Sequence, residues 1–262
     1  MKISIITPSY NSGKFIKKNI HSVLNQSYQN FEHLIQDNNS DDNTHKILNK
    51  YSHLKIFIES DKGQSDALNK LLKKTSGDIV GWLNADEYYN KKIFKKIVDF
   101  FKQNPDVDAI YGNLNLIDNN FRYIRTLYPL KYNKYWLPYS CIIPTATFFI
   151  RSKVLKKFKI KFNNNFFYKM DQEFFCKLSK FNARIIKIDI KISNFIIHDK
   201  AKTAFKINNI SKKKFNYEGI KIINKFGFFK IPENSLGIFI LIFLESFQKL
   251  LSFIIKKIYK FN

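Results

Sequence analysis

The chain has 262 residues, of which 45% are hydrophobic and 25% charged, so it can bury a substantial core and is not globally disordered. Its net charge of +24 is uneven, because residues 1–150 contain 20 basic and 14 acidic residues whereas residues 151–262 contain 25 and 7. Such a field attracts phosphate-rich partners, whether anionic lipid, nucleic acid or nucleotide diphosphates, although A- and T-rich codon usage would also raise the lysine content.

The first half of the chain alternates strand-like and helix-like patterns. Strands are predicted at Ile3–Thr7, Phe31–Gln36, Leu54–Ile58, Ile79–Leu83 and Ala109–Tyr111. Helices are predicted at Gly13–Asn25, through Ile47 and Leu48, at Gln64–Lys74 and at Ile93–Lys102. Strict alternation implies right-handed crossovers, so we predict an α/β fold with a Rossmann-like, mostly parallel sheet flanked by helices.

Three polar clusters directly follow predicted strands, at residues 8–11, 37–42 and 84–87. In an open parallel sheet, ligands bind beyond the carboxyl ends of the strands. The three clusters should therefore meet at one edge, where they indicate a nucleotide pocket. Each cluster alone would be an ordinary turn, since Asn, Asp, Ser and Pro favour turns.

Beyond Tyr111 the pattern changes to shorter pieces. Strands are predicted at Tyr123–Leu127, Thr145–Ile150, Arg184–Ile188 and Ile192–Ile197, and a helix at Asp171–Phe181. These elements would complete the sheet and carry the site for a second substrate.

The last segment, Leu236–Asn262, begins with the apolar run Leu236–Leu244 and ends in lysines. The run is too short to span a bilayer, which needs about 20 apolar residues. Amphipathic spacing followed by lysines favours a helix that lies in the membrane interface. A helix docked on the core of the protein itself is the alternative.

Asp86 follows a strand that is predicted to be buried. A carboxylate at that edge can reach a divalent cation held by a diphosphate, because Mg²⁺ and Mn²⁺ prefer oxygen ligands and often take only one or two from protein. The metal would neutralise the charge of a departing nucleoside diphosphate. The alternative is an Asp that caps the next helix.

Five segments resemble, in order and spacing, the successive motifs of the family 2 glycosyltransferases, which have the GT-A fold. They are Ile5–Asn11, Ser22–Tyr28, Gln36–Thr44, Asp61–Asn69 and Gly77–Glu87. The resemblance covers about residues 2–203. It implies one domain at 1–205, divided into a nucleotide-sugar half (1–112) and an acceptor half (113–205), followed by a basic, amphipathic helical extension at 206–262.

Position by position, the resemblance implies several functional residues. Asp37 matches the carboxylate that hydrogen-bonds the donor base, and Asp42 and Thr44 match a turn that supports this loop. Asp86 matches the second Asp of the Asp-x-Asp motif and would bind Mn²⁺ or Mg²⁺, although Asn84 replaces the first. The implied nucleotide-sugar site consists of Thr7, Pro8, Tyr10, Asn11, Asp37, Lys62, Gly63, Asn69, Asn84 and Ala85.

Two later segments complete the implied site. Met170–Phe174 is similar to the helix start that carries the catalytic base, so Asp171 is the candidate base, with N-capping of its helix as the alternative. A carboxylate in that place can take the proton of an acceptor hydroxyl as the new bond forms. His198, in Phe195–Thr203, is a candidate second metal ligand, and Lys202 could pair with phosphate, whereas a solvated loop is the alternative.

The leading hypothesis is an inverting transferase that moves a sugar from a nucleotide diphosphate sugar, with UDP favoured, to a hydroxyl of a surface glycan or lipid-linked oligosaccharide. The alternative, suggested by Asn84, is a catalytically degenerate protein that binds nucleotide sugar or scaffolds glycan assembly. Charge alone suggests nucleic acid, but no recognised motif supports a specific nucleic-acid partner. A dehydrogenase is excluded by the missing Gly-x-Gly-x-x-Gly turn.

The expected location is the cytosol, at the inner face of the membrane. The N-terminus has no signal-peptide pattern, and the two cysteines indicate neither a disulfide framework nor a zinc site. The basic second half and the terminal apolar helix predict peripheral contact with anionic lipid.

Overall fold

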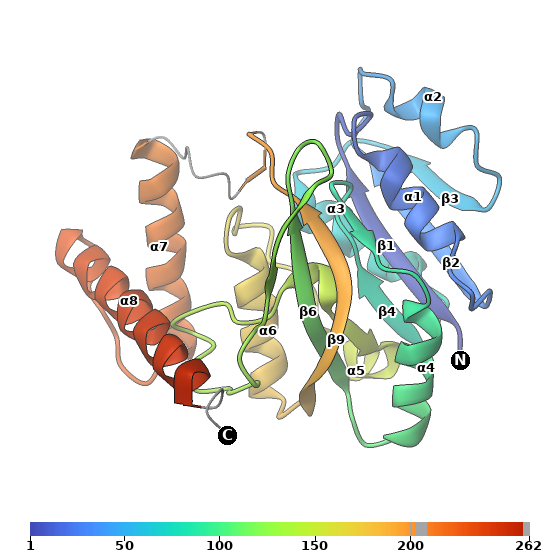
Figure 1. The fold of residues 1–262 in the computed structure, drawn as a ribbon. Coiled ribbons are helices and arrows are strands. Elements are labelled where there is room, and N and C mark those ends of the chain that lie inside the picture. The colour runs from blue at the N-terminus through green and yellow to red at the C-terminus, as the bar shows by residue number, and fades with distance from the viewer. Residues whose placement is uncertain (200, 203–208, 259–262) are drawn as a thin grey trace.

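The computed structural model describes residues 1–199, 201–202 and 209–258 (Figure 1). Thr203, the predicted boundary at 205–206 and residues 259–262 lie outside the described residues. The described strands form one mixed sheet in the order β3-β2-β1-β4-β8-β6-β9-β5, with β7 paired to β6. The strands are β1 (Ile3–Ser9), β2 (Phe31–Asp37), β3 (Leu54–Ile58), β4 (Ile79–Trp82), β5 (Glu87–Tyr89), β6 (Ala109–Ile117), β7 (Tyr123–Leu127), β8 (Phe149–Arg151) and β9 (Ile185–Ile196).

Helices cover both faces of this sheet (Figure 1). Side chains alternate along a strand, so β1 directs Ile3 and Ile5 toward α1 and α4, and Ile6 toward α3, α5 and α6. The helices are α1 (Ile16–Leu24), α2 (Thr44–Leu48), α3 (Gln64–Lys74), α4 (Ile93–Gln103), α5 (Ser152–Lys157), α6 (Met170–Lys180), α7 (Asn209–Phe226) and α8 (Ser235–Ile258), with a short 3-10 helix at Thr145–Thr147.

The predicted parallel arrangement is confirmed for β3, β2, β1 and β4, which all run in the same direction. Strands β6 and β9 are also parallel to each other, whereas β5, β7 and β8 run antiparallel to their partners. The α/β class is therefore as predicted. Of the antiparallel strands, β7 and β8 belong to the part of the chain expected to complete the sheet, and β5 comes earlier in the chain.

The observed elements differ from the predicted ones at three places. The predicted strand Thr145–Ile150 is a 3-10 turn followed by the short β8. The two strands predicted at Arg184–Ile188 and Ile192–Ile197 are one strand, β9, whose pairing with β6 shifts register around Asn113. β5 was not predicted, because its three residues are extended through pairing with residues 193–195 of β9, which are distant in the sequence.

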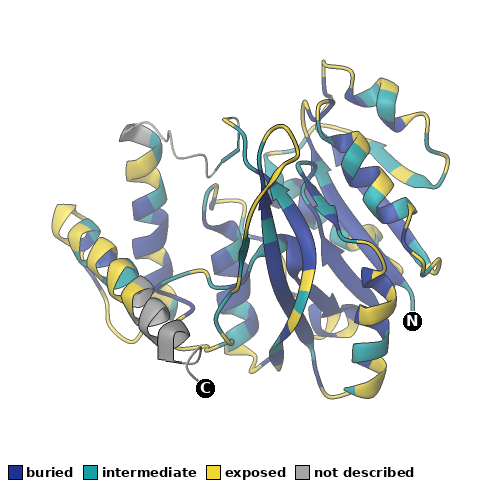
Figure 2. Cartoon of the chain, in the orientation of Figure 1, coloured by how far each residue is buried: buried dark blue, intermediate teal, exposed yellow. Residues whose placement is uncertain are grey.

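The C-terminal helices α7 and α8 pack against each other around an apolar cluster of Tyr139, Ile220, Ile223, Ile231 and Leu241. The opposite side of α8 is exposed over much of its described length (Figure 2). The alternative prediction, a helix docked on the protein, thus holds for one face of α8, and contact of the uncovered face with a membrane stays a prediction. Within the described residues, no helix is both long enough and apolar enough to cross a membrane.

Candidate active site

The carboxyl ends of β1, β2 and β4 lie side by side, as the polar clusters predict. The register aligns Ser9 with Asp37, and β4 pairs with β1 on the other side. Thr7 is fully buried there, with its hydroxyl 3.0 Å from Nε2 of His33, and Pro8 is half-buried. Thr7 therefore supports the floor of this edge from within the sheet.

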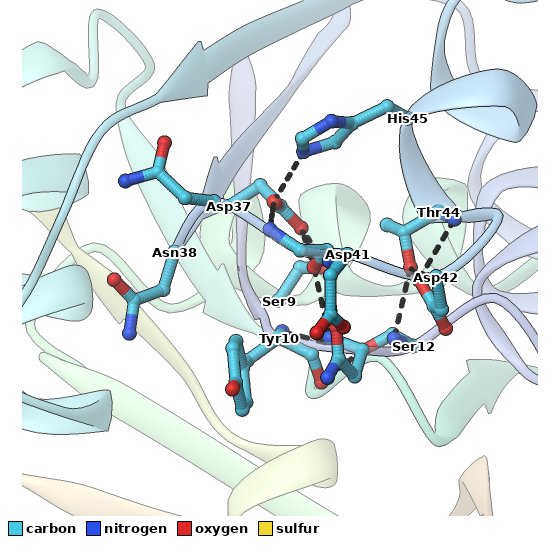
Figure 3. A network of polar contacts seen from close by, with 12 residues as sticks. Ser9, Tyr10, Ser12, Asp37, Asn38, Asp41, Asp42, Thr44 and His45 are labelled. Atoms are coloured by element: carbon cyan, nitrogen blue, oxygen red, sulfur yellow. Dashed lines mark hydrogen bonds and ion pairs between the residues drawn. The ribbon is translucent and has the colours of Figure 1, made fainter.

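Asp37 is the centre of a buried hydrogen-bond network at the end of β2 (Figure 3). Its Oδ1 accepts the backbone N–H of Ser40 at 2.8 Å and lies 2.7 Å from Nε2 of His45. Its Oδ2 accepts the hydroxyls of Ser9 and Ser40, both at 2.8 Å. Four hydrogen bonds occupy the carboxylate, so the structure gives Asp37 a supporting contact in this loop, and a direct hydrogen bond to the donor base stays a prediction.

Asn38 is the residue that this edge presents outward, and the sequence analysis missed it. Successive side chains of an extended segment point to opposite sides, so Asn38 is partly exposed where Asp37 is buried. Its backbone N–H donates to the carbonyl of Ser9 at 3.0 Å, and its Oδ1 accepts the N–H of Asp61 at 2.9 Å. Tyr10 lies directly after Ser9 and is 61% exposed. An exposed ring and an amide on neighbouring strand ends can stack on a nucleotide base and hydrogen-bond its edge.

Separate substitutions of Asp37 and Asn38 should distinguish a residue that stabilises the loop from one that binds the nucleotide base. Asp37→Ala leaves buried hydrogen-bond donors of Ser9 and Ser40 without an acceptor. We therefore expect the free energy of unfolding in urea to fall by roughly 2–4 kcal/mol. Asn38→Ala should change it by less than about 1 kcal/mol while weakening nucleoside diphosphate binding by about fivefold, the value of one hydrogen bond. If calorimetry shows full affinity in Asn38→Ala, the base contact does not involve Asn38.

The loop after β1 is held from the side by the turn before α2. Asp42 accepts the backbone N–H groups of Gly13 at 3.0 Å and Thr44 at 2.9 Å, and the Thr44 hydroxyl accepts the N–H of Ser12 at 2.9 Å. Asn11 lies in this loop with a left-handed backbone (φ 48°), a conformation that Asn tolerates well. The supporting role predicted for Asp42 and Thr44 is confirmed by these contacts.

The start of α3 reaches the same edge. Lys62 is exposed, and Gly63 has φ 105°, which a residue with a side chain would adopt only with strain. Gln64, which the sequence analysis did not single out, bridges two parts of the site. Its Nε2 donates to Oδ1 of Asn84 at 2.7 Å and its Oε1 accepts the Lys202 ammonium at 2.8 Å.

Asn69, further along α3, lies against a different segment. Its amide donates to the carbonyl of Phe162 at 2.9 Å and accepts the Phe162 N–H at 2.8 Å. This reciprocal pair ties α3 to the loop before α6. The structure thus gives Asn69 a supporting contact, and direct binding of the nucleotide stays a prediction.

The segment 84–87 divides its side chains between the interior and the edge. Asn84 accepts the indole N–H of Trp82 at 2.8 Å in addition to the Gln64 bond, and Ala85 is buried. Glu87 is also buried, and its carboxyl accepts the N–H of Asn84 at 2.7 Å. Burial, together with the charge of Asp86, raises the pKa of Glu87 to about 8. Asp86 is consequently the carboxylate of this segment that faces the edge.

Asp86 and His198 form the candidate metal pair. Nε2 of His198 lies 3.1 Å from Oδ2 of Asp86, with side-chain exposures of 11% and 21%. The ring of Phe15 packs on the imidazole, with centroids 4.5 Å apart. Among the described side chains, no group of three or more His, Cys, Asp and Glu is clustered for a metal. A carboxylate and an imidazole nevertheless fit a Mn²⁺ or Mg²⁺ ion whose other ligands are diphosphate and water.

Asp171 stands in the first turn of α6. Burial raises its pKa above the ordinary value of an aspartate, and its Oδ1 accepts the N–H of Gln172 at 2.7 Å. The residue that precedes the helix is Lys169, and no side chain caps it, so the capping alternative for Asp171 is not seen. Burial lowers the pKa of Lys202 to about 8. The opposite charges of Lys202 and Asp171 attract each other, which counteracts part of the pKa shift of each group.

The two C-terminal helices hold the segment in front of Asp171, which the sequence analysis did not foresee. The buried carboxylate of Glu218, on α7, accepts the N–H groups of Phe167, Tyr168 and Lys169 at 2.8–2.9 Å. The buried ammonium of Lys169 pairs in turn with Glu245 of α8 at 2.9 Å. The extension is therefore part of the framework of the site.

The sheet edge thus carries an exposed ring and an amide at neighbouring strand ends, a carboxylate–imidazole pair that fits a divalent cation, and Asp171 at the start of α6 nearby. The model of Glycosyl transferase family 2 matches residues 4–159, more than half of the chain. The chain belongs to this family and is a glycosyltransferase.

Known relatives agree with this assignment. WfgD from Escherichia coli, a UDP-Glc:alpha-D-GlcNAc-diphosphoundecaprenol beta-1,3-glucosyltransferase, is 34% identical over 166 residues, 61% of this chain. The aligned segments span 64% of WfgD and 42% of another relative, TuaG from Bacillus subtilis (strain 168), so the chain spans less than two thirds of either protein.

Solved structures confirm the GT-A fold. TarS from S. aureus in complex with UDP-GlcNAc aligns with a TM-score of 0.66 at 22% identity, over 89% of this chain and 68% of that chain. The mannosyltransferase PcManGT from Pyrobaculum calidifontis, in complex with GDP-Man and Mn2+, aligns with a TM-score of 0.64 at 17% identity, over 92% and 68%. At these identities the likeness concerns the fold alone.

Proposed function

We propose that the protein is an inverting transferase that moves a sugar from a UDP-sugar to a hydroxyl of a lipid-linked oligosaccharide at the cytoplasmic face of a membrane. The observation that carries the proposal is the convergence of Tyr10 and Asn38, the Asp86–His198 pair and Asp171 on one edge of the sheet. The UDP donor is supported by TarS with UDP-GlcNAc and by the name of WfgD. The lipid-linked acceptor is supported by WfgD.

Each residue of the proposed site would have a separate role in the reaction. Tyr10 and Asn38 would hold the base, and Lys202, which Gln64 positions, would neutralise part of the diphosphate charge. Asp86 and His198 would hold Mn²⁺ or Mg²⁺, which supplies charge neutralisation to the leaving nucleoside diphosphate. Asp171 would take the proton of the acceptor hydroxyl while its oxygen bonds to the anomeric carbon and the bond to the diphosphate breaks. A single displacement of this kind inverts the anomeric centre.

The degenerate alternative rests on Asn84, whose side-chain oxygen accepts hydrogen bonds from Trp82 and Gln64. Asp86 and His198, which would hold the metal, lie 3.1 Å apart, and Asp171, which would take the proton, is in the first turn of α6. The geometry therefore favours an active enzyme in which Asn84 shapes the metal segment.

A donor panel tests the proposal without knowledge of the acceptor. We expect calorimetry to show binding of UDP-sugars in preference to GDP- and dTDP-sugars in the presence of Mn²⁺, and slow release of UDP from one of them. Preferential binding of a GDP- or dTDP-sugar would overturn the choice of UDP. Absence of binding across the panel would overturn the donor site as described.

A further inference from the structure

The outer face of α8 carries a continuous row of uncovered apolar side chains. Leu236, Phe239, Phe243, Phe247 and Leu250 are 60%, 69%, 61%, 45% and 56% exposed. Their spacing of three to four residues places them on one side of the helix. The row is roughly 21 Å long, because 14 steps of about 1.5 Å separate Leu236 from Leu250. Such a patch exceeds the scattered exposed side chains of an ordinary surface and indicates a contact.

The helix is fixed to the protein by the opposite side. Leu241 is buried in the cluster with Ile220 and Ile223, and a Cβ at Gly237 would collide with the carbonyl of Pro232. The ion pair between Lys169 and Glu245 adds a second attachment. The exposed row is therefore held outward by a docked helix and cannot turn into the core.

The two-helix unit of α7 and α8 that carries the row has a basic surface, which favours an anionic partner. The described part of α7 and the turn after it present the exposed lysines Lys212, Lys213, Lys214, Lys221 and Lys230. Glu218 and Glu245 are engaged with the segment before α6, which leaves Glu233 as the exposed acid of residues 211–247. A second copy paired symmetrically through the same face would bring these lysine-rich units together, which is unfavourable.

We propose that the outer face of α8 inserts into the interface of an anionic lipid bilayer, with its aromatic and aliphatic row among the acyl chains and the lysines at the headgroups. An amphipathic helix with basic flanks binds membranes in this way. The proposal rests on the proposed function for its purpose, since a lipid-linked acceptor is reached from the bilayer surface.

The contacts that hold α7 and α8 on the protein extend to α6, the helix whose first turn contains Asp171. Phe228 and Phe229, in the turn between α7 and α8, stack on Tyr135 and Tyr139. The loop 133–140 that carries these tyrosines supplies the carbonyls to which the Gln172 side chain donates, at 2.9 and 3.1 Å. A bilayer docked on α8 is thus connected to the residue next to Asp171 through packed and hydrogen-bonded groups.

The experiment measures binding of the full chain to vesicles of phosphatidylcholine and phosphatidylglycerol in equal parts, and to vesicles of phosphatidylcholine alone. Wild type should bind the anionic vesicles more tightly, with a loss at high salt. The double variant Phe239→Ser, Phe243→Ser should bind at least about 100-fold more weakly, because each phenylalanine contributes about tenfold or more. The matched control Ile124→Ser, which changes an exposed residue of β7, should bind as wild type does.

Nucleotide binding and molecular mass complete the test. Unchanged calorimetric affinity of the double variant for UDP would show that its fold is intact, and vesicle binding itself needs neither donor nor acceptor. Equal vesicle binding by wild type and the double variant would overturn the proposal. A dimer by light scattering that the double variant converts to a monomer, without vesicle binding by wild type, would assign the face to a second copy instead.

Discussion

Asp171→Asn should lower the rate of sugar transfer by roughly 10²–10⁴-fold, the usual contribution of a general base. The asparagine keeps an oxygen for the N–H of Gln172, which Oδ1 of Asp171 now accepts at 2.7 Å, so the start of α6 should be unchanged. The affinity for the donor should also stay within about twofold, because the proposed role of Asp171 concerns the acceptor hydroxyl. Single-turnover kinetics with saturating donor measures the loss.

The pH dependence gives this prediction a second readout. Burial raises the pKa of Asp171, and a base must be deprotonated to accept a proton. The rate in wild type should therefore fall as the pH drops through that raised pKa, at a higher pH than an ordinary aspartate would require. This acid limb should vanish in Asp171→Asn. A variant that keeps the wild-type rate and limb would show that another group takes the proton.

The sequence located the site because its motifs mark the ends of β1, β2 and β4, which a parallel sheet brings together. It could not decide which of two neighbouring residues faces the pocket. Asp37 matches the motif, yet four hydrogen bonds occupy it, and the adjacent Asn38 is the one exposed. That choice depends on the direction in which β2 enters its loop, which residue types alone do not specify.

Contacts between distant segments were the other unpredicted part. Glu218 and Glu245 read as ordinary helix charges in the sequence, because nothing local relates them to the segment before α6. The extended conformation of β5 likewise depends on pairing with β9. These features arise from tertiary packing, and they show that α7 and α8 support the segment before α6.

Asp86→Ala should abolish most of the metal-dependent activity. Of the carboxylates in segment 84–87, Glu87 is buried with a pKa of about 8, so Asp86 is the one that can meet a cation beside His198. Because charge neutralisation by a bound metal is worth several kcal/mol, we expect the rate of nucleoside diphosphate release to fall on the order of 10³-fold. Initial rates measured across a Mn²⁺ titration provide the test.

The loss of Asp86 should lower the free energy of unfolding by roughly 1 kcal/mol, the value of the one hydrogen bond that its side chain makes with His198. Removal of metal by a chelator should lower wild type to the rate of Asp86→Ala and leave the variant unchanged. The matched control Asp99→Ala removes a half-exposed carboxylate of α4 that pairs with Lys95, and should titrate with Mn²⁺ as wild type does. Full stimulation of Asp86→Ala by Mn²⁺ would mean that the cation is held elsewhere, and His198 would then lose its role as the second ligand.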